Sequence, residues 1–495
     1  MRCSYCNLAC EFSIATDDIG ITGIEYLKSS NNEGRLCARG CANEILLKSG
    51  NRLTYPIVDN LPGCWDDALS KITDLITKYR DKTVITVGSE LTIDEFELIT
   101  GLGKNLTVPV IPINLDGGAG LRYQLKGIKK GNLKDLRDVD RLVTIGDIFS
   151  ISPVLAYYIL QFRNQKSHKH YHLDSLPSRT QSFADVYIPL SLNNEVSDLL
   201  SLAQGKLADC GLLEDLKDKT SLFIIALNTA RTADPITFSL AAQNLARQLK
   251  GKVIFTANNL GWPGEGSLTD LFDGIKNGRF KLVLNFGDEL LRFTDNLKGV
   301  RLISTSTIKV KTKRNWILLP APINCEKTGS IRGLSGIEKS EGFTPPSGVH
   351  QIEQLLRQIG KSLEIDIKKT TYKPDVWVED DSLSDLVQEN RVRKSKESFT
   401  LYGFNNPLNF RDLFDYPQIL LLNPEDLAKL KLSDYNHTDV GRKNYRVEAM
   451  VRRNSMIPRG TAAITVESSS TWPLFKIIKG FLVPSEVKVW SRRST

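Results

Sequence analysis

The opening stretch MRCSYCNLACEF, residues 1–12, holds three of the chain's eight cysteines. Cys3, Cys6 and Cys10 are followed by Cys37 in EGRLCARGC, so the complete pattern reads C-x2-C-x3-C-x26-C. Iron–sulfur clusters are held by four cysteine thiolates, and three closely spaced thiols with a fourth from a distant turn suit one cubane cluster. The pattern therefore predicts a 4Fe-4S cluster with these four cysteines as its metal ligands.

Two other roles for these cysteines stay open. Structural zinc usually takes two evenly spaced CxxC pairs or a mixture of Cys and His, and the uneven gaps here fit that pattern less well. Disulfides are disfavoured because Cys3 lies too close to Cys6 for a comfortable bridge. They are also disfavoured because the cysteines stand where a secretory signal would have its basic and apolar regions.

Two arginines flank the fourth cysteine of the pattern. Arg35 and Arg39 stand on either side of Cys37, and cationic groups near the sulfurs raise the reduction potential of a cluster. We expect Arg39 to lie next to the cysteine ligands and to influence the cluster's reduction potential without binding the metal. The alternative is an ordinary solvated side chain. Cys41 follows Cys37 by one helical turn and is a fifth candidate ligand. The other cysteines are isolated and are expected to be small buried hydrophobic residues: Cys64, Cys210 and Cys325.

Composition limits the class of protein. The 495 residues are 41% hydrophobic and 25% charged with a net charge of +8, which is ordinary for a globular chain of several domains. The sequence has no apolar run of the roughly 18 to 20 residues that a membrane span needs. We expect a cytoplasmic protein with membrane contact only through partner subunits. No nucleic-acid-binding motif accompanies the basic runs, such as residues 309–314, so a basic face toward an acidic protein partner is favoured over nucleic acid.

Apolar strands alternate with helical patterns through most of the chain. KTVITVGSE, residues 82–90, has the β-branched character of a buried strand, and ITFSLAAQNLARQL, residues 236–249, has helical spacing. Such alternation predicts parallel sheets covered on both faces, an α/β fold. The predicted domains are an N-terminal iron–sulfur domain (1–58), two doubly wound α/β domains (59–205 and 206–365), a linker (366–398) and a small β-rich, barrel-like domain (399–495).

Other catalytic patterns are weak. His168, His170 and His172 alternate on one predicted strand, where they could bind a metal, although exposed polar histidines are the favoured explanation. No strand is followed by G-x-G-x-x-G, which disfavours a Rossmann-type dehydrogenase, and no Ser, His and Asp set suits hydrolysis.

Further motifs occur in a fixed order along the chain. They are GRLCARG (34–40), NRLTYPI (51–57), WDDAL (65–69), VTIGDIFSISP (143–153), NCEKTGSIRGLSG (324–336) and LNPEDLAKLKL (422–432). Together with the four-cysteine pattern, this order resembles the molybdopterin oxidoreductase superfamily. That superfamily includes formate dehydrogenases, nitrate reductases and the large peripheral-arm subunit of respiratory complex I.

The chain departs from this family where the enzymes hold their metal. The family's metal ligand, a cysteine, selenocysteine, serine or aspartate, falls at or near Gly118 in VIPINLDGGAGLRY, and glycine has no ligating side chain. A shifted alignment would offer Asp116 as an aspartate ligand, although its position favours a role in the turn. Arg39 stands where the family has a lysine, and GDIF replaces the usual GSNP turn that binds the pterin. The resemblance therefore implies that molybdopterin is absent.

These losses are similar to the complex I branch of the superfamily. LNFGDELL (284–291) and ANNLGWPGEGSL (257–268) resemble stretches of its 75 kDa-type subunit, without that subunit's N-terminal ferredoxin-like part. The resemblance implies a non-catalytic electron-transfer and scaffold subunit of an NADH:quinone oxidoreductase-like complex, with one 4Fe-4S cluster and other redox subunits as partners. The alternative is a molybdenum- or tungsten-pterin oxidoreductase, such as a formate dehydrogenase or a formylmethanofuran dehydrogenase-like subunit. A binding module with a purely structural cluster is a third reading.

Overall fold

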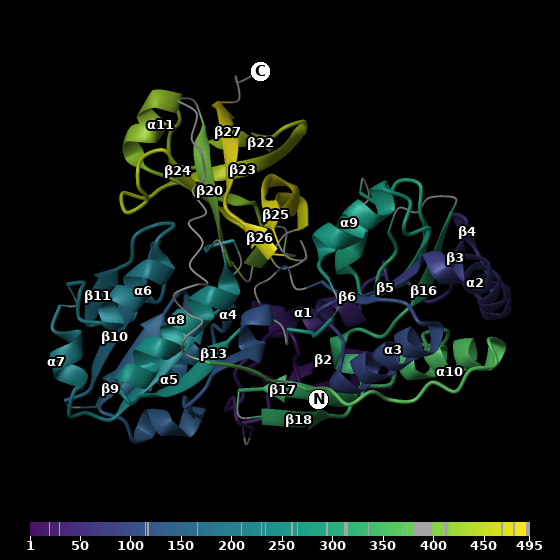
Figure 1. The fold of residues 1–495 in the computed structure, drawn as a ribbon, viewed down its shortest axis with the longest axis horizontal. Helices are drawn as coiled ribbons and strands as arrows, with labels where there is room; N and C mark the ends of the chain where they lie inside the picture. Colours follow the sequence, from purple (N-terminus) through teal and green to yellow (C-terminus); the bar gives the residue numbers. More distant parts are fainter. Residues whose placement is uncertain are drawn as a thin grey trace.

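A computed structural model gives the fold of the chain (Figure 1). It describes residues 1–491 except 19, 29, 114, 116, 117, 166, 209, 229, 233, 259, 260, 265, 294, 295, 311–314, 335, 374, 380–397, 407, 410–413, 415, 467, 468, 479 and 480. Asp116, most of the basic run 309–314 and most of the predicted linker 366–398 therefore lie outside the described residues.

The first parallel sheet has six strands in the order β11-β10-β9-β12-β13-β8, and every neighbouring pair is parallel. The central strand β12 is buried along its whole length, because helices α6, α7 and α8 cover one face and α4 and α5 the other. The strands are β8 (Lys129–Lys130), β9 (Arg141–Ile145), β10 (Lys169–Asp174), β11 (Val186–Pro189), β12 (Ser221–Ala226) and β13 (Lys252–Thr256). The helices are α4 (Ile148–Ile151), α5 (Leu155–Arg163), α6 (Glu195–Ala203), α7 (Leu212–Leu216) and α8 (Pro235–Gln248).

The second sheet has seven strands in the order β4-β3-β16-β15-β14-β5-β6, parallel except where β3 pairs with β16 and β4. Helices α2, α3 and α10 pack on one face, and α9 packs on the other. The strands are β3 (Ile57–Val58), β4 (Leu61–Pro62), β5 (Thr83–Val87), β6 (Val110–Pro112), β14 (Leu282–Phe286), β15 (Arg301–Ser306) and β16 (Trp316–Pro320). The helices are α2 (Trp65–Tyr79), α3 (Ile93–Leu106), α9 (Leu268–Lys276) and α10 (Ile352–Ser362).

The predicted boundary between residues 205 and 206 does not separate these two sheets. Strand β5 pairs with β14 across that boundary, and β9 pairs with β12. The six-stranded unit is instead inserted between β6 and β14 of the seven-stranded sheet. Alternating strands and helices reveal that parallel sheets exist, but the crossover connections decide which sheet each strand joins.

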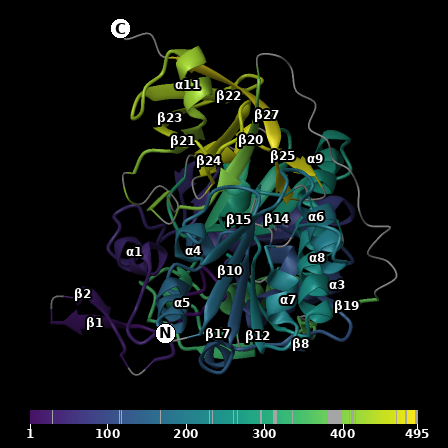
Figure 2. The same cartoon turned by 90° about the vertical axis from the view of Figure 1, so that its left-hand side faces the viewer.

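A closed barrel follows the two sheets, with strand order β20-β24-β21-β23-β22-β27. In Figures 1 and 2 it lies above both sheets, at the end of the molecule where the chain terminates. Together with the two α/β sheets and the N-terminal cysteine-rich part, it confirms the predicted fold class. Its elements are β20 (Phe399–Phe404), β21 (Ile419–Leu422), α11 (Pro424–Leu430), β22 (His437–Arg442), β23 (Tyr445–Arg453), β24 (Thr461–Thr465) and β27 (Ser485–Ser491).

Smaller elements connect these units. Four two-stranded sheets are formed by β1 (Ser13–Asp17) with β2 (Gly20–Glu25), β7 (Tyr123–Leu125) with β19 (Val376–Val378), β17 (Gly329–Gly333) with β18 (Gly336–Ser340), and β25 (Lys476–Ile478) with β26 (Phe481–Val483). Helix α1 spans Ala38–Leu47. The 3-10 turns are η1 (Arg80–Lys82), η2 (Gly118–Arg122), η3 (Leu133–Arg137), η4 (Gln181–Phe183), η5 (Glu289–Arg292), η6 (Asn324–Glu326) and η9 (Ser469–Leu474).

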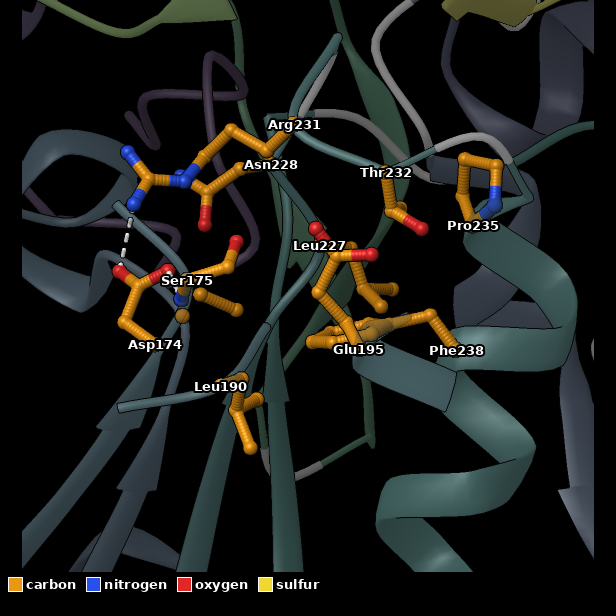
Figure 3. A pocket seen from close by; sticks show the side chains of 12 residues that line it. Asp174, Ser175, Leu190, Glu195, Leu227, Asn228, Arg231, Thr232, Pro235 and Phe238 are labelled. Atoms are coloured by element: carbon orange, nitrogen blue, oxygen red, sulfur yellow. Dashed lines mark hydrogen bonds and ion pairs between the residues drawn. The ribbon is translucent and has the colours of Figure 1, made fainter. Parts of the chain in front are cut away.

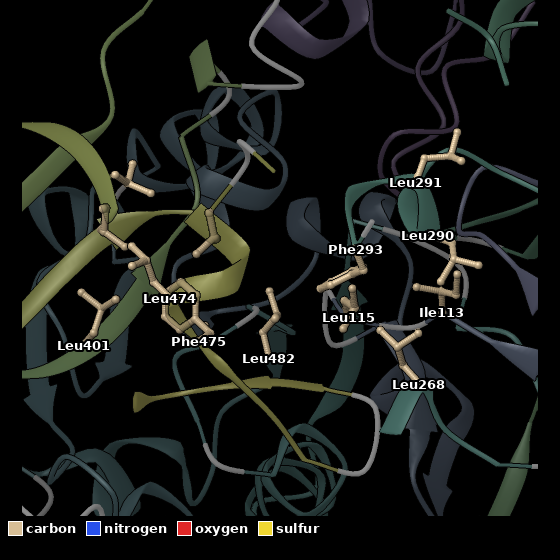
Figure 4. Close-up of a cluster of buried hydrophobic side chains, with 14 of the residues drawn as sticks. Ile113, Leu115, Leu268, Leu290, Leu291, Phe293, Leu401, Leu474, Phe475 and Leu482 are labelled. Carbon is tan, nitrogen blue, oxygen red and sulfur yellow. The ribbon is translucent and has the colours of Figure 1, made fainter. Parts of the chain in front are cut away.

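An apolar cluster joins the barrel to the seven-stranded sheet and to the segment after β6 (Figure 4). The backbone N–H of Leu482 donates to the carbonyl of Leu115 at 3.5 Å. The rings of Phe293 and Trp472 stack with centroids 6.0 Å apart. These contacts cross from one unit to the other, so burial of apolar surface holds the barrel in place.

In the part of the chain that the structure describes, no helix has the length and apolar character needed to cross a membrane.

Candidate iron–sulfur centre

The N-terminal cysteines lie on a short closed loop. The backbone N–H of Cys3 donates to the carbonyl of Cys10 at 2.8 Å, and the N–H of Ala9 donates to the carbonyl of Cys6 at 3.2 Å. Ala9 has a φ of 52°, in the left-handed region, which lets the chain reverse direction just before Cys10. The thiols of all three cysteines are buried. The local backbone therefore holds them together inside the protein.

Cys37 is the N-cap residue of helix α1. It interacts electrostatically with Cys3, Cys6 and Cys10, although 26 residues separate it from the last of these. The N-terminus of a helix carries a partial positive charge, which favours a thiolate or an anionic cluster at this position. The fold thus brings together the four cysteines that the spacing pattern selected.

Burial dominates the electrostatics of the loop. It raises the pKa of the Cys3, Cys6 and Cys10 thiols, and the neighbouring cysteines raise these values further. Such buried thiols become thiolates when a metal replaces the proton. In a four-iron cluster each thiolate binds a different iron, so the ligands stand further apart than around a single ion. Among the described residues, no three His, Cys, Asp or Glu side chains stand close enough to hold one ion.

Arg39 lies behind the cysteines and is 1% exposed, so the solvated alternative is wrong. Its guanidinium donates to the side-chain oxygen of Asn258 at 2.5 Å and to the backbone carbonyl of Ile151. The same cation lowers the pKa of the thiols of Cys6 and Cys3, against the larger effect of burial. A buried cation in this place favours added negative charge on a neighbouring cluster.

The cysteine loop is docked on the carboxyl end of the six-stranded sheet. The Asn7 side chain donates to the carbonyl of Phe255 at 2.8 Å and accepts from the N–H of Ala257 at 3.0 Å. The Cys6 thiol hydrogen-bonds to Ser152, whose hydroxyl lies 2.5 Å from that of Thr256. In open α/β sheets this is the end at which ligands bind.

A narrow crevice opens at the same end of that sheet, after β9, β10 and β12 (Figure 3). The Arg231 guanidinium donates to the Asp174 carboxylate at 2.6 Å, and both side chains are buried. Burial raises the pKa of the nearby Glu195 carboxyl to about 7. The cavity measures about 20 Å³, room for about one water molecule.

The turn after β9 forms one wall of this crevice. Gly146 has a φ of 79°, and a Cβ there would lie 3.0 Å from the side-chain oxygen of Asn228. That oxygen accepts from the N–H of Asp147 at 2.9 Å, and the Asn228 amide donates to the Asp147 carbonyl at 3.2 Å. The GDIF turn is therefore fixed by a buried amide.

The chemistry of these residues fits one end of a pterin dinucleotide. Carboxyl groups accept hydrogen bonds from ribose hydroxyls and base N–H groups, and a guanidinium suits phosphate. Asp174, Glu195 and Arg231 provide this set. At the metal end, Gly118 begins η2 and offers no side chain, and Asp116 lies outside the described residues. The described residues have the side-chain chemistry of a nucleotide site, but Asp174 and Arg231 are paired with each other and the cavity between them has room for about one water. Position 118 provides no side-chain ligand.

The histidine pair is structural. His170 and His172 are both fully buried, and the Thr144 hydroxyl lies 2.7 Å from His170 Nε2 and 2.9 Å from His172 Nδ1. Burial lowers the pKa of each imidazole to about 3. The expected shared face is present for His170 and His172, whereas His168 precedes β10 and is half-buried. The expected exposure is wrong for the pair, because β10 is an inner strand with helices on both faces of the sheet.

The remaining cysteines divide by burial. Cys325 is buried as expected, whereas Cys64 and Cys210 are exposed, so the expectation of buried residues is wrong for these two. Cys64 is exposed because it caps helix α2, where its sulfur accepts from the N–H of Asp67 at 3.4 Å. Cys41 is half-buried, with its sulfur 3.7 Å from the Tyr26 hydroxyl.

The crevice residues Asp174, Glu195 and Arg231 were not predicted from the sequence. The signal was present for Asp174, since a carboxylate directly after an apolar strand commonly faces a ligand in α/β folds. Glu195 and Arg231 follow loops rather than strands, and no spacing rule connects them to Asp174.

The chain is similar to known proteins in part of its sequence and in its fold. Residues 2–43 match the Molybdopterin oxidoreductase Fe4S4 domain, which supports a 4Fe-4S cluster in this part of the chain. The F420-dependent formate dehydrogenase subunit alpha of Methanocaldococcus jannaschii is 24% identical over 204 residues, which are 38% of this chain and 30% of that protein. The match thus spans less than a third of that relative. Acetylene hydratase from Pelobacter acetylenicus shares the fold, with a TM-score of 0.76 over 99% of both chains at 12% identity.

These findings support the molybdopterin oxidoreductase superfamily and correct the expected branch. The expectation of a complex I-like electron-transfer and scaffold subunit is contradicted, because the matching relative is a formate dehydrogenase subunit and the matching fold is that of acetylene hydratase. The sequence-based case for that branch rested on expected losses at Gly118, Arg39 and GDIF. Losses of this kind do not identify a branch, because any branch can lose the same side chains.

Proposed function

We propose that this chain is a redox subunit of a molybdenum- or tungsten-pterin oxidoreductase of the formate dehydrogenase class. Its Cys3, Cys6, Cys10 and Cys37 hold a 4Fe-4S cluster that relays electrons to partner redox subunits. We place the assembly in the cytoplasm. The proposal rests on the similarity to a formate dehydrogenase alpha subunit and on the site geometry together.

One observation carries the proposal: the cysteine loop and the nucleotide-type crevice share one end of one sheet. Asn7 fastens the loop to the end of β13, while Asp174 and Glu195 line the crevice beyond β10. Arg39, beside Cys6, donates to the carbonyl of Ile151 at the end of α4, the helix that follows the Gly146 turn in the crevice wall. An electron relay needs this closeness of cluster and cofactor.

Different residues of this chain would contact different parts of the cofactor. In a crevice wider than its present about 20 Å³, Asp174 and Glu195 would accept hydrogen bonds from the nucleotide, and Arg231, released from Asp174, would face its phosphates. A bound molybdenum- or tungsten-pterin supplies a centre for two-electron oxidation and reduction. Because position 118 is glycine, the chain contributes no side-chain ligand there. Arg39 stabilises the extra electron on the cluster by its buried positive charge.

The test is a metal analysis of the full chain, purified without oxygen from cells supplied with both molybdate and tungstate. Iron, acid-labile sulfide, molybdenum, tungsten and pterin are measured in one sample, and formate-dependent reduction of benzyl viologen is measured beside them. The matched control is Cys210→Ala, since Cys210 is exposed and lies outside the cysteine loop.

We expect about four iron and four sulfide per chain with stoichiometric molybdenum or tungsten, unchanged in Cys210→Ala. A cluster without either heavy metal or pterin would overturn the pterin-enzyme assignment and would agree with the sequence-based expectation that molybdopterin is absent. Zinc in place of iron would overturn the cluster itself. Bound heavy metal without formate activity would overturn the formate dehydrogenase class and leave the pterin assignment standing.

A further inference from the structure

A second, much larger cavity lies beside the cysteine loop. It measures about 910 Å³ and is open to solvent. Its walls come from the cysteine loop, the segment after β2, η3, helix α5 and the β17–β18 turn. We call it the side groove and define it by its lining residues Leu8, Glu33, Lys134, Arg137, Tyr158 and Leu334.

The side groove comes within one layer of side chains of the cluster ligands. Leu8 stands between Cys6 and Cys10 in the sequence and lines the groove. Leu8 and Tyr158 both pack against the buried group of side chains that contains Cys3 and Cys10. The floor of the groove is therefore the wall of the candidate cluster site.

The groove carries unbalanced positive charge. Glu33 pairs with Arg35 at 3.2 Å, and Glu338 shares Arg2 with Glu11, so the acidic residues leave at most one uncompensated negative charge beside the two cations of the groove. Lys134 and Arg137 are exposed, and neither forms an ion pair with another described residue. The free charge facing solvent is therefore cationic, which favours an acidic partner.

The remaining surface of the groove is suited to a brief protein contact. Leu133 and Leu334 are half-buried in its wall. A small apolar patch with a charged rim is typical of electron-transfer partners, whose interfaces are small and whose association is steered by charge.

We propose that the side groove is the docking surface for an acidic iron–sulfur protein, which exchanges single electrons with the cluster through Leu8 and Tyr158. This inference rests on the cluster of the proposed function and adds the partner and its site. One electron passes between the two clusters, so that one is oxidised as the other is reduced, and no bond is made or broken. A mixed basic and apolar rim distinguishes this site from one for a small anion, which a few cations alone would bind.

The test measures electron transfer from a reduced, acidic 4Fe-4S ferredoxin to the oxidised cluster of the full chain by stopped-flow absorbance. Lys134→Glu with Arg137→Glu reverses the charge of the groove. The matched control is Lys276→Glu with Lys361→Glu, which changes the net charge by the same amount on helices α9 and α10 of the other sheet. Gln165→Lys adds a cation to the groove wall. Iron content and reduction by dithionite are measured for each variant.

In low salt, we expect the groove reversal to lower the second-order rate constant at least about tenfold and Gln165→Lys to raise it, with both differences fading at high salt. The control pair changes the rate by less than about twofold. Equal losses in both charge-reversed pairs, or an unchanged rate in the groove reversal, would overturn the docking site while the cluster stands. Absence of iron from the unaltered chain would overturn the proposed function together with this inference.

Discussion

The carboxyl ends of the two parallel sheets differ in whether they leave a cavity, although both sheets are built from the same strand–helix units. In the six-stranded sheet the end is polar: Asp174 pairs with Arg231, and Glu195 borders a cavity. In the seven-stranded sheet the Glu289 carboxylate, just after β14, covers the end of the neighbouring strand β5. It accepts from the N–H of Ser89 at 2.9 Å, and a Cβ on Gly88 would collide with it.

This difference shows that topology offers a ligand site and that side chains decide whether it stays open. At the seven-stranded end Trp262 also closes the space, because its indole N–H donates to the Gly88 carbonyl at 2.9 Å and its ring stacks on Phe96. The cysteine loop hydrogen-bonds to the end of the other sheet, through Asn7. Four predictions test the contrast, given from the largest expected effect to the smallest.

Removing a cysteine ligand should abolish what is present only at the six-stranded end. Cys10→Ser leaves three thiolates for a cluster that takes four, so we expect loss of most of the iron and of the visible absorbance. Cys64→Ser changes an exposed cysteine on the seven-stranded side and should keep the full iron content. Iron content of Cys10→Ser equal to that of the unaltered chain would remove Cys10 from the ligand set.

Breaking the buried ion pair of the open crevice should cost the most stability. Arg231→Met leaves the Asp174 carboxylate buried without its cation, and we expect the free energy of unfolding to fall by about 3 to 5 kcal/mol. Arg163→Met breaks the partly exposed pair with Asp185 and should cost about 0 to 1 kcal/mol. Both values come from urea unfolding. Equal losses would mean that the crevice pair is no better shielded from water than a surface pair.

The Glu195 carboxyl should make stability depend on pH. Its pKa of about 7 lies above the ordinary value of 4.5, so the folded chain holds a proton that the unfolded chain releases. The associated stability is complete below about pH 4.5 and is lost as the pH rises through 7, by at most about 3 kcal/mol.

Glu195→Gln should flatten that fall, which urea unfolding at pH 5, 6, 7 and 8 measures. Glu289→Gln is the matched change at the closed end, where burial also raises the carboxyl pKa. A Glu195→Gln curve parallel to that of the unaltered chain would mean that Glu195 does not titrate in this range.

The smallest effect is expected at the cap of helix α2, on the seven-stranded sheet. Cys64→Ser keeps a side chain that accepts from the N–H of Asp67, so the free energy of unfolding should change by less than about 0.5 kcal/mol. Cys64→Ala removes the acceptor and should cost about 0.5 to 2 kcal/mol. A larger loss in the serine variant would point to a packing role that the exposure of Cys64 does not indicate.

The sequence predicted the cysteine loop and the fold class for physical reasons. Ligand spacing is local, so the pattern C-x2-C-x3-C can be recognised within ten residues. Strand–helix alternation can likewise be recognised from short segments of the sequence. The assignment of strands to sheets was not predicted, because β5 pairs with β14 although the whole six-stranded unit lies between them in the sequence. The crevice was missed because Asp174 and Arg231 meet across a sheet. The complex I branch was inferred from absent side chains, which carry less information than present ones.

The attachment of the first residues to the end of β13 has a consequence for synthesis of the chain. The Asn7 side chain donates to the carbonyl of Phe255, 248 residues later in the sequence. The cysteine loop therefore leaves the ribosome long before β13, the strand that it contacts, has been synthesised. At about 5 to 20 residues per second, the wait lasts roughly ten to fifty seconds. During that time the thiols are unshielded in the nascent chain. The burial that the structure gives these thiols is therefore complete only after the six-stranded unit has folded.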